Sequence, residues 1–210
     1  MAVVHDLIKA WEGIEDGDPS TVNLDPYICP AGHPTIGWGT LVKTPDGTPV
    51  VTIAAARRVY PNGITLAEAE AFLNRDIESM QAAILRDGGR FLLRWRTLSE
   101  AQQAALVSIT YNIGTGGFAA STLKRMIENG AMPGPLAGLD INKEFQASKT
   151  GQPIATIAGA FLAWNKSNQR QGGRWVKKWT RGLARRRAAE ALIFYGETVP
   201  AALARAQALV

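Results

Sequence analysis

The spacing of apolar residues changes twice along this chain, and these changes limit the folds open to it. Residues 3–11 place apolar side chains at helical intervals, which predicts a short amphipathic helix that stops at Gly13. Between residues 16 and 62 the helical period disappears, and β-branched runs alternate with glycine- and proline-rich turns, as in a small antiparallel sheet with long loops. From Thr65 onward the helical period returns. The pattern predicts an α+β fold, mainly α, whose two lobes leave a cleft as the natural ligand site.

Capping and breaking residues divide the helical part. Capping boxes formed by Thr65 with Glu68 and by Ser99 with Gln102 predict the starts of two helices. We expect the helix that starts at Thr65 to end at Gly88 and Gly89. Further helices are expected at 121–129, 154–165 and 182–195, and a last helix is expected to begin at Pro200. Residues 131–153 contain three prolines and no clear period, so we expect an exposed loop or insertion there.

Composition fits one ordinary globular domain. Hydrophobic residues make up 46% of the chain and charged residues 20%, near the average for such domains. We expect a single domain over residues 1–210, with a small β lobe at about 14–62 and a helical lobe at about 63–210 plus the N-terminal helix. The single cysteine, Cys29, excludes an internal disulfide framework. No apolar stretch is long enough to span a bilayer, and charged residues interrupt the N-terminal apolar run, so neither a transmembrane segment nor a signal peptide is expected.

The formal net charge of +5 favours an anionic partner. Much of the charge lies between Arg174 and Arg187, a run with seven basic residues, two tryptophans and no acid. Such runs also occur at single-stranded nucleic-acid sites and on membrane-surface helices. We interpret this one as a solvated face that attracts an anionic cell wall. Peripheral contact with a membrane stays open as an alternative, and no nucleic-acid partner is expected.

The most informative stretch runs from Trp11 to Thr40. Glu12-Gly13 ends the first helix, and Tyr27, Cys29 and the run TIGWG at 35–39 follow in order. This ordered set resembles the phage lysozymes of glycoside hydrolase family 24. The resemblance continues downstream through ITLAEAEAFLNRDI, LSEAQQAALVSITYNIGTGGFAASTL, FLAWNK and GLARRRAAEAL. It implies a lysozyme-like two-lobed domain and an endolysin that hydrolyses the β-1,4 bond between N-acetylmuramic acid and N-acetylglucosamine in peptidoglycan, for host cell lysis.

Glycosidic cleavage needs a carboxylic acid to protonate the leaving oxygen, and a group on the opposite face to activate water or stabilise the developing charge. Glu12 fits the acid, because partial burial between helix and sheet would raise its pKa; taken alone, it could equally be an exposed helix-terminal carboxylate. The resemblance implies that Cys29 and Thr35 position the attacking water. It also implies contacts with bound sugar for Leu41, Tyr111 and Ser121, although each residue type is also common in a core or at a helix cap.

Three departures from the family pattern matter. Sixteen residues separate Glu12 from Cys29, which requires an acidic insertion at about 14–25; the usual spacing from Glu12 would reach Thr21 instead. Thr40 stands where the family usually has a histidine, and its effect is expected on stability rather than chemistry. Cys29 replaces the usual aspartate, and a neutral thiol is a weak acceptor and no base. His33 is then an auxiliary base candidate, or simply a solvated loop residue.

Two other functions stay open. A lytic transglycosylase would need Glu12 alone, and a basic module could bind cell wall or nucleic acid without turnover. Neither a cofactor nor a metal site is expected, because the two histidines lie far apart and no nucleotide-binding motif is present. The expected partners are peptidoglycan glycan strands and a holin-type pore-former. The protein is expected to be a monomer in the host cytoplasm until its release to the periplasm or cell wall.

Overall fold

The computed structural model describes residues 2–29, 31–86, 89–172 and 174–210. It divides into two compact units, one made of Met1–Leu7 with Met80–Val210 and the other of Ile8–Ser79. The chain is mostly helical with small antiparallel sheets, so the predicted α+β, mainly α class is confirmed.

The unit Ile8–Ser79 is built on a three-stranded antiparallel sheet. It holds the end of α1 (Ala2–Glu12), the helix α2 (Ile53–Val59) and the start of α3 (Leu66–Leu85). The sheet has the strand order β1 (Tyr27–Ile28), β2 (Pro34–Ile36), β3 (Thr40–Leu41). Ile36, Trp38, Ile64, Ala69 and Leu73 are among its buried apolar residues.

The capping box predicted at Thr65 and Glu68 is present. The Thr65 hydroxyl accepts a hydrogen bond from the Glu68 backbone N–H at 3.2 Å, while the Glu68 carboxylate accepts one from the Thr65 backbone N–H at 2.8 Å. The apolar stripe of α3 is buried at Ala69, Leu73 and Ile77, as its spacing predicts. The helix ends at Leu85; of the two glycines expected to stop it, Gly88 lies outside the described residues and Gly89 begins the next helix.

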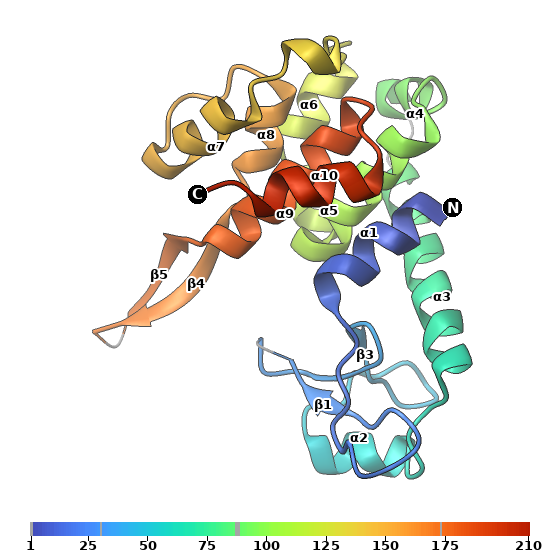
Figure 1. Cartoon of the computed structure of the whole chain (residues 1–210). Helices are drawn as coiled ribbons and strands as arrows, with labels where there is room; N and C mark the ends of the chain where they lie inside the picture. Colours follow the sequence, from blue (N-terminus) through green and yellow to red (C-terminus); the bar gives the residue numbers. More distant parts are fainter. Residues whose placement is uncertain (1, 30, 87–88, 173) are drawn as a thin grey trace. The chain divides into compact units, whose positions relative to one another are not determined.

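The other unit is a helical assembly around α9 (Arg181–Phe194), which packs against α5 (Glu100–Ala119), α8 (Ile157–Leu162) and α10 (Val199–Gln207) (Figure 1). Its remaining elements are α4 (Gly89–Trp95), α6 (Thr122–Glu128), a 3-10 turn at Leu136–Gly138, α7 (Ile141–Thr150) and the hairpin strands β4 (Lys166–Gln171) and β5 (Arg174–Trp179). Small residues such as Ala188 and Ala189 are fully buried, so neighbouring helices can approach α9 closely. The capping box predicted at Ser99 and Gln102 opens α5.

The expected loop at 131–153 is wrong in its second half. Residues 141–150 form α7, whose N-cap Asp140 accepts a hydrogen bond from the Lys143 backbone N–H, and Gly151 ends the helix with φ 70°. Ile141 and Phe145, four residues apart, supply its buried face. The three prolines of this segment lie outside the helix. They led us to expect a loop, because the helical spacing of Ile141 and Phe145 covers only two apolar residues.

The solvated face expected for the basic run is wrong at Arg186 and Arg187. Both are buried, and Glu190 lies between them with its side chain fully buried. The Glu190 carboxylate lies 3.3 Å from Arg186 Nε and 2.9 Å from Arg187 Nε, and it accepts a hydrogen bond from the Ser108 hydroxyl at 2.7 Å. Arg185 donates to the Leu209 carbonyl. Arg186 and Arg187 therefore belong to the core of the helical unit, while the exposed cations of the run are Arg174, Lys177 and Lys178 in the hairpin and Arg181 at the start of α9.

Within the described residues, no helix is both long enough and apolar enough to cross a membrane.

Candidate active site

Glu12 is the last residue of α1, and local contacts fix where that helix ends. Gly13 follows with φ 64°, a left-handed conformation that glycine adopts without strain, and its N–H donates to the Lys9 carbonyl. Lys9 pairs with Glu70 of α3 at 2.7 Å, and its ammonium lies 4.5 Å from the centre of the Trp38 ring. Lys9 therefore ties the end of α1 to α3 and to the turn between β2 and β3.

The strand register puts Cys29 and Thr35, the two residues expected to position the attacking water, on one face of the sheet. Tyr27 pairs with Thr35, and Thr35 pairs with Leu41. Directly paired residues share a face, and Cys29 follows Tyr27 by two positions, so its side chain returns to that face. The Cys29 backbone N–H donates to the His33 carbonyl at 3.0 Å, which extends the pairing beyond β1. Tyr27, Cys29, Thr35 and Leu41 thus form one row of side chains.

Glu12 lies beside this row. A Cβ atom placed on Gly39, in the turn between β2 and β3, would be 3.9 Å from Glu12 Oε2. Burial raises the pKa of Tyr27, and the negative charges of Glu15 and Glu12 raise it further. The nearby Thr35 hydroxyl lowers the pKa of Tyr27, although the two hydroxyl groups are not in hydrogen-bond geometry. The Tyr27 phenol donates to the Gly37 carbonyl at 3.3 Å, so it stays protonated at neutral pH.

The Thr35 hydroxyl is the unusual group of the row. Thr35 is 4% exposed, and its Oγ1 has no hydrogen-bond partner among the described residues. Buried hydroxyls almost always bond to protein or to ordered water. This hydroxyl therefore has both its donor and its acceptor capacity available for a water molecule or a ligand.

The insertion at 14–25 is an ordered loop held by its own aspartates. Asp16 Oδ1 accepts hydrogen bonds from the backbone N–H groups of Asp18 and Asp25, both at 3.0 Å. The Asp25 carboxylate accepts from the Thr21 hydroxyl at 2.6 Å. A Cβ on Gly17 would lie 2.1 Å from the Pro26 carbonyl oxygen, so only glycine fits there. Thr21 and Asp25 are therefore engaged with each other, while the alternative base His33 is exposed.

Thr40, at the position where a histidine is usual, is bonded to an acid that the sequence reasoning missed. Its buried hydroxyl donates to Asp76 Oδ2 on α3 at 2.7 Å. Burial raises the pKa of Asp76, and the Thr40 hydrogen bond with the charges of Arg75 and Lys43 opposes that rise. Asp76 falls on the buried side of the predicted helix, next to Ile77, and that position was the available signal.

Two predicted sugar contacts belong to the helical unit. Tyr111 is half-buried on α5. The Ser121 hydroxyl caps α6 by accepting a hydrogen bond from the Lys124 backbone N–H. Ser121 also lines a pocket of about 360 Å³ with Trp164, Lys166 and Lys177, which sequence reasoning had not assigned to a site. Trp164 and Lys166 lie within the FLAWNK segment, so the sequence did contain a signal for them.

A helix-terminal glutamate beside a small sheet, with a mainly helical unit following in the chain, defines a glycoside hydrolase of the lysozyme type. A model of the phage lysozyme family matches residues 11–139, more than half of the chain, and the chain belongs to that family. It is accordingly a lysozyme, an endolysin that hydrolyses peptidoglycan.

Solved structures of two other proteins share this fold. The endolysin from Escherichia coli O157:H7 phage FAHEc1 is 28% identical, with a TM-score of 0.57 over 93% of this chain and 92% of its own. The muramidase domain of SpmX from Asticaccaulis excentricus is 22% identical, with a TM-score of 0.55 over 93% and 96% of the two chains. At that identity the second likeness concerns the fold alone. No curated protein sequence gives a significant match.

Proposed function

We propose that Glu12 is the general acid of this lysozyme and that Thr35 and Cys29 hold the attacking water. One observation carries the proposal: the buried Thr35 hydroxyl lacks a protein partner and shares a sheet face with Cys29, beside Glu12. Glu12 protonates the leaving glycosidic oxygen. The Thr35 hydroxyl and the Cys29 thiol orient a water molecule that attacks the anomeric carbon as the glycosidic bond breaks, and the proton that this water loses passes to solvent. Neither is a carboxylate, so positioning replaces general-base catalysis as their main contribution.

The sugar contacts are part of the same proposal. Leu41 continues the row next to Thr35 and offers an apolar surface to a sugar ring. Within the helical unit by itself, Tyr111 offers a polar group to bound sugar, and the Ser121 pocket offers a place for a glycan substituent.

The decisive test compares Glu12→Gln with Glu15→Gln, which alters an exposed carboxylate three residues away. Glu12→Gln removes the transferable proton and keeps the shape, so muramidase activity on purified sacculi should fall at least about 100-fold while the fold is retained. Glu15→Gln should hydrolyse sacculi like the wild type. A folded Glu12→Gln variant with wild-type rates would refute the assignment.

Cys29 in place of a carboxylate also favours a second candidate, a lytic transglycosylase that relies on Glu12 alone. Such an enzyme closes the sugar onto its own oxygen and needs no attacking water. Analysis of the released muropeptides separates the two: reducing ends indicate hydrolysis, and anhydro ends indicate transglycosylation.

We propose further that the protein acts as a monomer and reaches the wall through a separate holin-type pore-former. The proposal of a separate pore-former is supported by the apolar run at residues 3–11, which forms α1 and buries Val4, Leu7 and Ile8 in the folded protein.

A further inference from the structure

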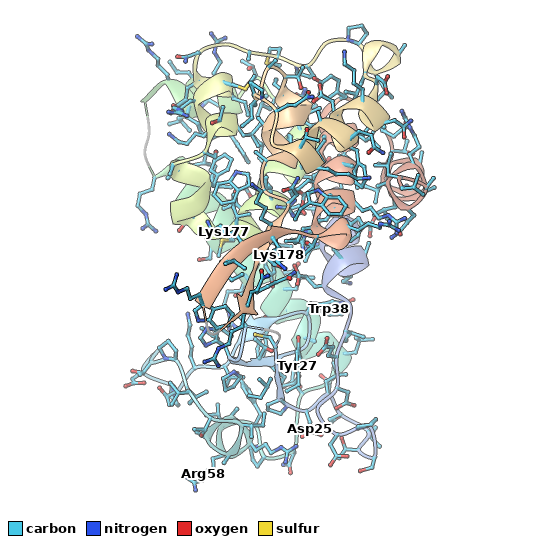
Figure 2. All side chains as sticks on the ribbon, turned by 90° about the vertical axis from the view of Figure 1, so that its left-hand side faces the viewer. Asp25, Tyr27, Trp38, Arg58, Lys177 and Lys178 are labelled. Carbon is cyan, nitrogen blue, oxygen red and sulfur yellow. The ribbon has the colours of Figure 1, made fainter. Side chains whose placement is uncertain are left out.

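The hairpin of β4 and β5 carries an excess of positive charge that the lysozyme reaction does not require. Between Lys166 and Trp179 the chain has five basic residues and no acid. The two strands pair in register over six residue pairs, from Lys166 with Trp179 to Gln171 with Arg174. The hairpin extends away from the helices of its own unit (Figure 1), and Lys177 and Lys178 lie along β5 (Figure 2).

The two ends of the hairpin differ in their surroundings. At the base, Trp179 packs edge-on against Phe145, with 5.8 Å between the ring centres, and Lys149 lies over both rings. Near the tip, Trp175 is 72% exposed, although large aromatic side chains are normally covered in folded proteins. The base is therefore anchored in the helical unit while the tip presents a tryptophan to solvent.

Basic residues surround the exposed tryptophan on both faces. Trp175 pairs with Arg170 across the strands, so these two share one face, and Arg174 projects from the other face one position nearer the tip. Arg170 and Arg174 are both exposed. Lys178 adds a further exposed cation on the Arg174 face, closer to the base.

We propose that this tip binds the surface of an anionic phospholipid bilayer. Tryptophan is enriched where water meets the lipid headgroups, because its ring is apolar and its N–H is polar. Arginines on both faces can reach phosphates around an inserted ring. A wall polymer held by charge alone would not need an exposed tryptophan. A single-stranded nucleic acid needs a track of stacking rings, and of the two hairpin tryptophans only Trp175 is exposed.

The test measures co-sedimentation of the full chain with phospholipid vesicles. The wild type should bind vesicles of phosphatidylglycerol mixed with phosphatidylcholine, and it should not bind phosphatidylcholine alone. Arg170→Gln with Arg174→Gln should weaken binding about 30-fold, because each basic residue at an anionic surface contributes about fivefold. Trp175→Ala should weaken it by at least about tenfold, and that loss should persist at high salt, which screens charges but not burial.

A matched control removes two exposed cations elsewhere, Arg58 and Lys143, by the same change to glutamine. This variant should bind anionic vesicles as the wild type does. Equal binding of the wild type to neutral vesicles, or wild-type binding by the tip variants, would overturn the proposal. So would tip-dependent binding to sacculi or to a single-stranded oligonucleotide without binding to anionic vesicles.

The membrane proposal does not depend on the role of Glu12. The tip residues lie outside the row beside Glu12 and outside the Ser121 pocket, so all tip variants should hydrolyse soluble glycan fragments at the wild-type rate. Glu12→Gln should bind anionic vesicles normally. Failure of either proposal would therefore be seen separately from failure of the other.

Discussion

Cys29 is half-buried on the sheet face that carries Thr35, where a base of the usual kind would be a carboxylate. Cys29→Ser keeps a small hydrogen-bonding group and should retain most of the activity on sacculi. Cys29→Ala removes one hydrogen bond to the water, worth about 1 kcal/mol, so activity should fall roughly fivefold. Cys29→Asp supplies a general base and should raise activity near neutral pH.

The exposed His33 provides the control for this series, and His33→Ala should have wild-type activity. If Cys29→Ala behaves like the wild type while Asp25 or His33 proves indispensable, the register assigned to the insertion is wrong. Wild-type activity in all these variants, together with anhydro products, would establish the transglycosylase.

Asp76 makes stability depend on pH with an unusual sign. Burial raises its pKa in the folded state, so folding favours the protonated carboxyl. Its contribution to stability is fully present below the unfolded pKa and is lost as pH rises through the folded pKa. Asp76→Asn keeps an acceptor for the Thr40 hydroxyl and removes the ionisation. In urea unfolding, this variant should gain stability relative to the wild type as pH rises from 3 to 7.

Asp46 gives the opposite case within the same chain. Hydrogen bonds from Thr44 and Thr48 lower its pKa, so its contribution to stability is present above the unfolded pKa and is lost as pH falls. Asp46→Asn should therefore be less stable than the wild type at neutral pH, and the difference should close in acid. The same trend for both variants would contradict the account of Asp76.

At the residue scale, the family resemblance singled out Tyr27, Cys29, Thr35 and Leu41 but not their neighbours. That these four side chains share one sheet face follows from the strand register in the structure. The position of Asp76 on the buried side of the predicted helix was a signal of its burial, but its partner Thr40 lies 36 residues away, and no local pattern reports that contact.

At the element scale, prediction succeeded where caps and apolar stripes coincide, as at the start of α3 and of α5. The β4–β5 hairpin was missed because neither strand has a fully buried residue, so neither shows alternation of apolar and polar side chains. Arg186 and Arg187 of α9 were wrongly expected to be exposed, because charged side chains usually lie at the protein surface. Glu190, three and four residues after Arg187 and Arg186, was the signal for a buried cluster.

The cluster on α9 predicts a large and specific loss of stability. Glu190→Gln keeps the side-chain volume but leaves two buried guanidinium groups without their carboxylate, which should cost about 3–5 kcal/mol of unfolding free energy. The partly exposed pair of Arg205 with Glu197 is the matched control, and Arg205→Gln should cost no more than about 1 kcal/mol. Chemical denaturation of both variants compares them directly. Equal small losses would show that Glu190 does not hold the cluster together.

At the scale of the whole molecule, the basic residues behind the formal charge of +5 differ in how far they are exposed to solvent. Arg186 and Arg187 are buried in the helical unit, whereas the hairpin exposes basic residues around Trp175. Net charge alone therefore overstates the surface available for electrostatic attraction, and the position of each cation decides what it can bind.

The last prediction concerns how the protein reaches the cell wall. The apolar residues near its N-terminus are committed to α1, where Val4, Leu7 and Ile8 are buried and Lys9 pairs with Glu70. Asp6 and Lys9 interrupt this apolar run, which does not fit an export signal, so expression without a partner should not lyse a Gram-negative host promptly. Co-expression with a pore-former should produce lysis, measured as a fall in culture turbidity, and Glu12→Gln should abolish it while the pore-former still permeabilises the membrane. Prompt lysis by the wild type alone would mean that residues 3–11 act in export before they fold, and that the pore-former is unnecessary.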